Sequence, residues 1–278
     1  MVVSQDKITS RQNRLVVETG KLCERKERTA RRQFCLDGVK LFGEAVEKGV
    51  TIARVFVAES KMVRMMAELE RFSASEALAN TVVHVLSDDV FAKLSTEQAP
   101  EGILSVADFP SFHVNGEPSR ALLTASCCSD KGILLLESVR DPGNVGTILR
   151  SAAAFGVDCV AISADCADIY NPKTVRGAMG ALFRMKIAVF SDISEAITLL
   201  RGHGRRVFAA ALDPTALKLE PRLLSRRDCV VVGNEGHGLS AAAIASCDRS
   251  LYIPMEAGSE SLNAAIAASV ILWSMYNG

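Results

Sequence analysis

A carboxylate, a hydroxyl and an amide stand in two short stretches of the carboxyl-terminal half, each beside a run of apolar residues. Glu235 lies in a Gly-Asn-Glu-Gly turn directly after the β-branched run 230–232, which indicates a buried strand that delivers a carboxylate to its end. Ser261 and Asn263 open a segment rich in Ala, Ile and Val that is typical of a helix. Such polar groups, beside exposed backbone amides, are suited to binding a ligand.

Parallel strands are the elements expected to position these groups. A second short strand, 251–253, stops at Pro254, because the proline ring fixes φ and removes a backbone N–H. The turns after both strands and the start of the helical segment therefore meet at one edge of a sheet. Ligands of α/β proteins bind in a crevice at the carboxyl ends of parallel strands, so we expect Glu235, Ser261 and Asn263 there.

Three stretches together resemble the motifs of a known family. They are ESVRDPGNVGTILR (137–150), GNEGHGLS (233–240) and IPMEAGSESLN (253–263). In this order and spacing they resemble the three motifs of the SpoU/TrmH family of RNA ribose 2′-O-methyltransferases, over residues 130–278. The resemblance implies an α/β domain with a mostly parallel sheet and a deep trefoil knot at which the cofactor binds.

The resemblance also implies a methyl donor, S-adenosylmethionine, and an acceptor, the ribose 2′-hydroxyl of an RNA nucleotide. Gly233, Ile253 and Leu262 match the family positions whose loops bind the donor, and we expect Met255 to line the same pocket. Small or apolar residues there would let the backbone approach an adenine edge while side chains close around its faces. Each residue alone is more simply an ordinary turn or core residue, whereas the ordered set favours the site.

Polar roles follow from the same resemblance. Asn144 would hold local geometry, Glu235 would order its turn, and Ser261 and Asn263 would hydrogen-bond around the donor and the incoming nucleotide. Two structural alternatives stay open. Asn144 is also suited to capping the helix that follows it, and Ser261 to capping the last helix.

Family proposals make the first-motif arginine, Arg150 here, the general base. Removing a proton from arginine at pH 7 costs roughly 7 kcal/mol or more, from a reference pKa of about 12.5 and about 1.36 kcal/mol per pKa unit. We therefore expect Arg150 to act chiefly as a clamp on an RNA phosphate that orients the 2′-hydroxyl. In a further family-like stretch, 171–180, Lys173 and Arg176 are candidates for RNA contact or for local packing.

The amino-terminal part alternates expected strands and helices, which is typical of a small three-layer α/β domain. Its short motifs are SRQN (10–13), FCLDG (34–38) and QAPEGIL (98–104). In this order they resemble the ribosomal-protein-L30e-like substrate-binding domain, whose implied task is to hold structured RNA; an accessory dimerisation domain is the alternative. We place this domain at 1–108. A linker rich in turn-forming residues is expected at 109–130, and the catalytic domain at 131–278.

The charge of the chain is uneven. Its 32 basic and 32 acidic residues cancel, so the net charge gives no indication of a nucleic-acid partner. Residues 1–32, however, carry nine Lys and Arg against four Asp and Glu. This excess predicts either a basic face for RNA phosphates or an ordinary solvated helical surface.

Other patterns argue against several classes of protein. The eight cysteines form no CxxC pair and lie mostly in apolar runs, which favours a reduced, cytoplasmic protein. No signal peptide or membrane span is recognisable, and the four histidines lack metal-ligand spacing, so we expect neither membrane nor metal. The missing G-x-G-x-x-G fingerprint argues against an ordinary dinucleotide-binding fold.

Two functions of different classes remain. The favoured one is a ribose 2′-O-methyltransferase that acts on RNA, ribosomal RNA rather than tRNA. We expect a homodimer formed through the knotted domain, with the apolar last helix that carries Trp273 as its face. The alternative is a catalytically inactive RNA-binding ribosome-assembly factor on the same fold. The intact set of polar motif residues favours the enzyme, and the missing phosphate-binding fingerprint speaks against an oxidoreductase.

Overall fold

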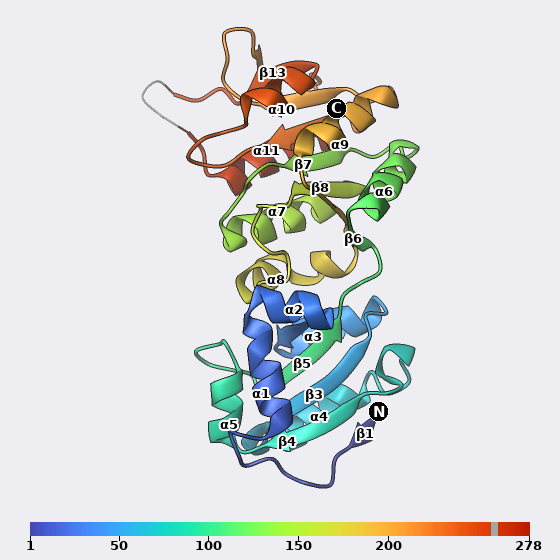
Figure 1. Ribbon diagram of the computed structural model, residues 1–278, viewed down its shortest axis with the longest axis vertical. Helices are drawn as coiled ribbons and strands as arrows, with labels where there is room; N and C mark the ends of the chain where they lie inside the picture. The colour runs from blue at the N-terminus through green and yellow to red at the C-terminus, as the bar shows by residue number, and fades with distance from the viewer. Residues whose placement is uncertain (257–260) are drawn as a thin grey trace. The chain divides into compact units, whose positions relative to one another are not determined.

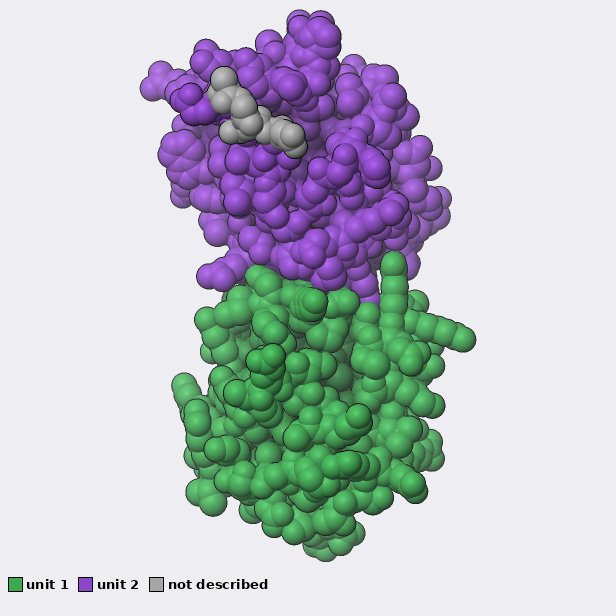
Figure 2. All heavy atoms as spheres, turned by 90° about the vertical axis from the view of Figure 1, so that its left-hand side faces the viewer, with its two compact units in different colours: residues 1–110, 170–183 green, residues 111–169, 184–278 purple. Residues whose placement is uncertain are grey.

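The computed structural model describes residues 1–256 and 261–278. Contacts within the chain divide it into two compact units, which Figure 2 colours separately. Unit 1 comprises Met1–Pro110 and Tyr170–Phe183, and unit 2 comprises Ser111–Ile169 and Arg184–Gly278. Each unit is built around its own β-sheet (Figure 1).

Unit 1 contains a five-stranded sheet and short helices. Its strands are β1 (Val2–Val3), β2 (Gln33–Asp37), β3 (Ile52–Ala58), β4 (Val82–Leu86) and β5 (Ile103–Asp108). Its α-helices are α1 (Arg14–Gly20), α2 (Arg25–Arg31), α3 (Val39–Glu47), α4 (Met62–Glu70), α5 (Asp88–Leu94) and α8 (Pro172–Ala178). Its 3₁₀ turns are η1 (Lys21–Cys23), η2 (Glu59–Lys61), η3 (Glu76–Leu78) and η4 (Met179–Phe183).

The sheet of unit 1 has the order β1-β4-β3-β5-β2 and is mixed, because β5 runs antiparallel to both β2 and β3. The expected alternation of strands and helices from residue 33 onward is confirmed. The first 32 residues form two helices, and Asn13 caps the first of them by accepting a hydrogen bond from the Leu15 N–H. Phe34 and Phe56 are fully buried in the unit.

A segment from the middle of the chain completes unit 1. The Tyr170 ring stacks on Phe109 with 3.7 Å between centroids and lies 4.7 Å from the Phe34 centroid. Arg176 of α8 forms an ion pair with Glu97, which gives this candidate RNA residue a protein partner. The predicted catalytic domain was continuous from 131 to 278. Contacts within the chain group residues 170–183 with the amino-terminal unit, through pairs that no local sequence pattern reveals, and the domain boundaries stay a prediction.

Unit 2 contains an eight-stranded sheet. Its strands are β6 (His113–Asn115), β7 (Ile133–Leu136), β8 (Cys159–Ser163), β9 (Lys186–Phe190), β10 (Val207–Ala210), β11 (Leu217–Lys218), β12 (Cys229–Val232) and β13 (Arg249–Tyr252). Its helices are α6 (Glu117–Cys127), α7 (Pro142–Ala154), α9 (Ile193–Gly202), α10 (Ala241–Ser246) and α11 (Ala264–Tyr276).

All strand pairs of this second sheet are parallel, in the order β11-β13-β10-β12-β7-β8-β9-β6. The central strands read ILLL, CVAIS and CVVV, and every residue in them is buried. Continuous apolar runs are typical of parallel strands that are covered on both faces. The predicted α/β class with a parallel sheet is confirmed; the trefoil knot stays a prediction.

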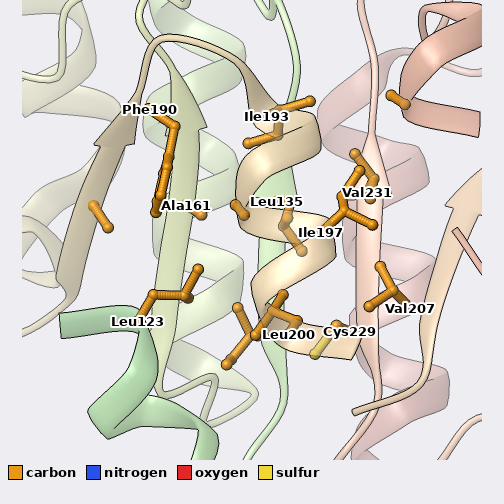
Figure 3. Packing of buried hydrophobic residues seen from close by; sticks show 14 of the residues in the cluster. Leu123, Leu135, Ala161, Phe190, Ile193, Ile197, Leu200, Val207, Cys229 and Val231 are labelled. Atoms are coloured by element: carbon orange, nitrogen blue, oxygen red, sulfur yellow. The ribbon is translucent and has the colours of Figure 1, made fainter. Parts of the chain in front are cut away.

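Helices α6 and α9 pack on one face of the sheet, and Figure 3 shows part of this core. Leu135 and Val231 of the sheet lie in one cluster with Ile197 and Leu200 of α9. Truncating a buried leucine of such a cluster to alanine costs about 2–5 kcal/mol of stability. Helices α7 and α11 pack against each other, and α11 also contacts β12.

The residues predicted as a linker, 109–130, contain regular secondary structure, while the linker assignment itself stays a prediction. These residues form β6, which pairs with β9, and helix α6. The polar composition does not indicate this structure, because Ser119 is fully buried and its hydroxyl donates to the carbonyls of Val114 and Val189. A serine that satisfies its hydroxyl in this way belongs to a helix face that packs inward.

Four of the eight cysteines are buried, two are partly buried, and Cys23 and Cys128 are exposed. All eight are free thiols. Burial raises the pKa of Cys35, Cys159, Cys229 and Cys247 to about 12, so these four stay protonated at neutral pH.

No helix within residues 1–256 and 261–278 combines the length and apolar character that a bilayer crossing requires.

Candidate active site

A cavity of about 420 Å³ opens at the carboxyl ends of β10, β12 and β13. Its walls come from the turns after these strands and from the start of α11. Six of the residues singled out from the sequence line it: Gly233, Glu235, Ile253, Met255, Ser261 and Leu262. Segments that are distant in the chain therefore converge as expected, whereas the roles of the residues stay predictions.

The position of the cavity follows from the order of the strands. Strands β7 and β12 are neighbours, but the chain leaves β7 toward β8 and β9 before it returns through β10 to β12. The strand order therefore reverses between β7 and β12, and β12 is one of the three strands whose carboxyl ends border the cavity. Crevices of this kind are the usual ligand sites of open parallel sheets.

A tight turn after β12 forms one wall of the cavity. Asn234 and Gly238 pair across it, with the Asn234 N–H donating to the Gly238 carbonyl at 3.1 Å and the reverse bond at 2.9 Å. A Cβ at Gly233 would lie 2.5 Å from the Gly238 backbone carbon and oxygen. Gly233 is therefore required by the turn itself, before any ligand is considered. The sequence prediction gave it the role of admitting the donor, with an ordinary turn residue as the alternative.

Three predicted residues form a hydrogen-bonded chain beside this turn. The Asn144 amide donates from Nδ2 to Oε1 of Glu235, and its Oδ1 accepts from Nδ2 of Asn263 at 3.0 Å. The Asn263 Oδ1 in turn accepts from the backbone N–H groups of Ala265 at 2.9 Å and Ile266 at 3.3 Å. The chain runs from the turn after β12, through α7, to the first turn of α11.

Both side-chain amides in this hydrogen-bonded path, Asn144 and Asn263, have only one possible orientation. A carboxylate only accepts, so Asn144 must present its NH₂ to Glu235 and its oxygen to Asn263. Asn263 must then give its own NH₂ to Asn144, which leaves its oxygen for the helix N–H groups. Asp141 caps α7 and Asn263 caps α11. The two alternative roles, Asn144 and Ser261 as helix caps, are therefore wrong.

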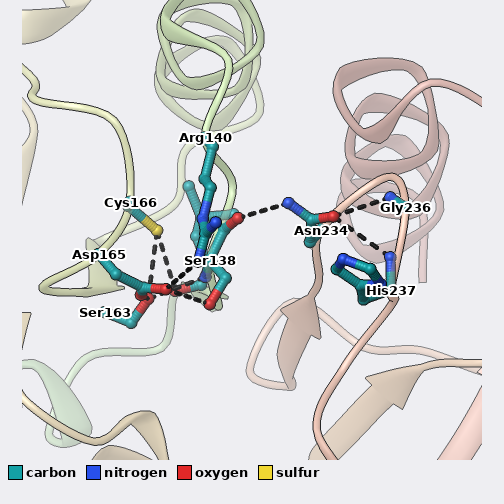
Figure 4. Close-up of polar contacts among 9 residues, drawn as sticks. Ser138, Arg140, Ser163, Asp165, Cys166, Asn234, Gly236 and His237 are labelled. Carbon is teal, nitrogen blue, oxygen red and sulfur yellow. Dashed lines mark hydrogen bonds and ion pairs between the residues drawn. The ribbon is translucent and has the colours of Figure 1, made fainter.

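Two further contacts join the loop after β7 to the turn after β12, and sequence reasoning missed both. Glu137 accepts from the hydroxyl and the backbone N–H of Ser240, at 2.7 and 2.8 Å. The Asn234 side chain donates from Nδ2 to the Ser138 carbonyl at 2.8 Å, as Figure 4 shows. Glu137 begins the first motif and Asn234 lies between two residues already selected, and only their side-chain partners distinguish them.

Arg150 lies away from this cluster of hydrogen bonds. It is an exposed residue near the end of α7 and is not part of the cavity wall. Among the described residues its guanidinium has no hydrogen bond or ion pair. The next residue, Ser151, contacts Ser269 of α11 through the two hydroxyl oxygens at 2.8 Å. Arg150 is thus an exposed cation, unpaired among the described residues, on a helix that packs against α11.

The residues that the structure describes include no group of three or more His, Cys, Asp or Glu side chains placed to hold a metal ion. The cavity instead offers apolar side chains, backbone groups of tight turns and a few polar side chains. This composition is typical of sites for small organic molecules.

Comparison with known protein families decides which family carries this arrangement. Residues 131–273 match the SpoU rRNA Methylase family. This stretch includes all residues of the cavity wall and the three residues of the hydrogen-bonded path, Glu235, Asn144 and Asn263. The chain belongs to the SpoU rRNA methylase family. Residues 13–105, within unit 1, match the MRM3-like substrate binding domain.

Several relatives resemble this SpoU-family chain along almost its full length. The 23S rRNA (guanosine(2553)-2′-O)-methyltransferase RlmP of Bacillus subtilis is 31% identical over 96% of this chain and 98% of the relative. The crystal structure of the SpoU methyltransferase AviRb from Streptomyces viridochromogenes in complex with AdoMet is 25% identical, with a TM-score of 0.79 over 95% of this chain and 97% of AviRb. A crystal structure described as an RNA 2′-O ribose methyltransferase is 27% identical, with a TM-score of 0.76 over 97% of both chains.

Proposed function

We propose that this SpoU-family protein is an RNA (ribose-2′-O)-methyltransferase that uses S-adenosylmethionine and acts on ribosomal RNA. The observation that carries the proposal is the cavity at the carboxyl ends of β10, β12 and β13, where Gly233, Ile253 and Leu262 meet. RlmP, whose name specifies a 23S rRNA 2′-O-methyltransferase, supports ribosomal RNA as the substrate class.

The residues of the cavity fit the donor. Its volume of about 420 Å³ lies in the range of about 300–1,000 Å³ that is usual for sites of small organic ligands. Ile253, Leu262 and Ile271 give it apolar walls for a flat adenine ring, and the turn at 233–238 brings backbone groups to its edge. When bound, S-adenosylmethionine supplies an activated methyl group.

The polar residues of the site would then position the acceptor. The chain from Glu235 through Asn144 to Asn263 holds three loops at fixed spacing, and such alignment is worth an effective molarity of about 10⁵–10⁸ M for two reacting groups. Ser261 offers an exposed hydroxyl at the cavity wall. Arg150, an exposed guanidinium on α7, would clamp an RNA phosphate in a bidentate contact and so orient the 2′-hydroxyl.

Unit 1 would hold the RNA. Many of the basic side chains at the amino terminus already have partners: Arg14 pairs with Glu18, and the buried Arg28 donates to backbone carbonyls. Lys21 and Lys26 are exposed, and their side-chain ammonium groups make no hydrogen bond or ion pair with other described residues. We expect these two to contact phosphates. The match to the MRM3-like substrate binding domain supports this role.

A second copy of the chain is the partner we propose for α11. Four apolar side chains stand exposed along this helix at spacings of four, three and three residues, a single stripe on its surface: Ile266 (54% exposed), Val270 (36%), Trp273 (59%) and Tyr276 (45%). A contiguous stripe of this kind marks an interaction face. Self-association would cover it in a symmetric dimer.

Titration calorimetry with S-adenosylmethionine tests the donor, and transfer of labelled methyl to total ribosomal RNA tests the reaction. We expect the protein to bind the donor and to label one position of the RNA. RNA that already carries the 2′-O-methyl group at that position should take up no label. Absence of binding at millimolar donor would favour the inactive assembly factor. Mapping the 2′-O-methyl marks that a deletion strain lacks would identify the nucleotide.

A further inference from the structure

Ser138, directly after β7, adopts a backbone conformation that is uncommon for a residue with a side chain. Its φ is +55°, in the left-handed region. Such a conformation costs of order 1–2 kcal/mol for a residue other than glycine, so surrounding contacts must hold it. Two do so: the Ser138 N–H donates to Oγ of Ser163 at 2.8 Å, and the Ser138 hydroxyl donates to Oδ2 of Asp165 at 2.5 Å.

Asp165 is the acceptor at which these contacts meet. It follows β8, and its Oδ1 accepts from the Ser163 hydroxyl at 2.6 Å, while Arg140 approaches Oδ2 at 3.5 Å. Burial raises the pKa of Asp165, but hydrogen bonds from Ser138, Ser163 and Arg140 outweigh it, so the pKa lies below its ordinary value. The carboxylate is therefore ionised and accepts both hydroxyl protons at neutral pH.

The held conformation of Ser138 aims its carbonyl at the turn after β12. That carbonyl accepts from Nδ2 of Asn234 at 2.8 Å. Because the Asn234 NH₂ is engaged there, its Oδ1 faces the backbone N–H groups of Gly236 at 2.8 Å and His237 at 3.2 Å. Figure 4 shows the path from Asp165 through Ser138 to this turn.

We propose that Asp165 is a positioning residue for the donor cavity, acting through the Ser138 carbonyl and the Asn234 amide on the turn that carries Glu235. The inference rests on the proposed function, because it treats that cavity as the donor site. Asp165 does not line the cavity itself, whereas Asn234, Glu235 and His237 do. Three adjacent strands, β8, β7 and β12, are thereby connected at their carboxyl ends by side chains as well as by the sheet.

The variant Asp165→Ala tests the proposal with two readouts in the full-length protein. A hydrogen bond to a charged group contributes about 1.5–3 kcal/mol, so the dissociation constant for S-adenosylmethionine should rise about tenfold or more. In the donor-free protein, amide hydrogen exchange of residues 233–238 should become faster. The matched control is Asp158→Ala, at the other end of β8, where the carboxylate pairs with Lys186 at 3.0 Å. It should change neither readout.

Serine variants separate positioning from a general loss of stability. Ser138→Ala removes the hydroxyl that holds the left-handed backbone through Asp165, so it should reproduce the effects of Asp165→Ala, and it is the fallback if Asp165→Ala does not fold. In a Ser138→Ala background, Asp165→Ala should add little, because its partner is already gone. Additive effects would overturn the proposed path.

The possible failures are distinguishable. If the unmodified protein binds the donor and Asp165→Ala binds it equally well with unchanged exchange at 233–238, the positioning role is wrong and the proposed function stands. If the unmodified protein binds no donor, the proposed function is wrong, and the donor role of Asp165 falls with it. If Asp158→Ala and Asp165→Ala changed donor binding and hydrogen exchange equally, a general loss of stability of β8 would explain both results. That outcome would overturn the positioning role.

Discussion

Asn263 donates a hydrogen bond from its Nδ2 to Oδ1 of Asn144 at 3.0 Å, across 119 residues of sequence. Asn263 also caps α11, and Asn144 also donates to Glu235. A single path of hydrogen bonds therefore joins the first turns of α7 and α11 to the turn after β12. Each amide has one permitted orientation, so the path fails if any donor becomes an acceptor.

Asn144→Asp is the sharpest test of this path. The substitution conserves shape but places a second carboxylate against Glu235, and two like charges in contact repel. We expect methyl transfer to ribosomal RNA to fall by at least about tenfold, corresponding to a loss of about 1.4 kcal/mol. Asn171→Asp is the control, because the Asn171 oxygen only caps α8 and an aspartate caps equally well. Full activity of Asn144→Asp would exclude the path as a functional element.

Gly233→Ala should abolish donor binding because it displaces the turn that forms one wall of the cavity. The new Cβ would lie 2.5 Å from the Gly238 backbone, so the turn must open and the cavity wall must move. Titration calorimetry should detect no binding at donor concentrations that saturate the unmodified protein. Gly202→Ala is the matched control, since a Cβ there meets nothing within 4 Å in helix α9. It should bind normally and gain roughly 0.5–1 kcal/mol of stability.

Two substitutions of Arg150 distinguish a phosphate clamp from a simple positive charge. Arg150→Ala should weaken RNA binding and reduce the salt dependence of the association constant by about one phosphate contact. Arg150→Lys should keep the salt dependence, because the charge remains, but lower the single-turnover methylation rate about tenfold, since the bidentate fork is gone. Filter binding at several salt concentrations and a rapid-quench assay measure these quantities. Full single-turnover methylation by Arg150→Lys would rule out the clamp.

Trp273→Lys should prevent self-association. Trp273 is 59% exposed in the apolar stripe of α11, and a charge there cannot be buried in a symmetric interface without a partner. Sedimentation velocity should show a dimer for the unmodified protein and a monomer for the variant. Val63→Lys, which replaces an apolar side chain that is 86% exposed on α4, should leave the dimer intact. A monomer in the unmodified protein would disprove the assignment of α11 as the dimer face.

Asp37 should make unit 1 less stable as the pH rises. Burial raises the pKa of Asp37, and the neighbouring Glu97 acts in the same direction. The folded state therefore holds this proton more tightly than the unfolded state, and its stability falls as pH rises from about 4 through the raised folded pKa. Asp37→Asn removes the titration, so the thermal midpoint of the variant relative to the unmodified protein should increase with pH across this window. A difference that is independent of pH would contradict the assignment.

Local patterns predicted most elements well because their causes are local. Strand β12 is a run of four buried residues, and Pro254 follows soon after β13. The same reasoning did not anticipate the helix at 117–127, where the buried Ser119 bonds to carbonyls of other elements, or the contacts of residues 170–183 with the amino-terminal unit. Stacking of Tyr170 on Phe109 depends on residues 61 positions apart, and periodicity within a segment carries no information about such pairs.

The candidate site divides in the same way. The sequence by itself determined the parallel α/β class, the motif residues from Asn144 to Asn263 and their likeness to one family, because strand runs, turn residues and ordered motifs are properties of adjacent positions. Only the tertiary structure shows that Asn263 caps α11 and that Gly233 leaves room for the backbone of Gly238. Only the tertiary structure connects Asp165 to the turn after β12, through hydrogen bonds of Ser138. Hydrogen bonds need donor and acceptor within about 3 Å, and only the folded chain sets those distances.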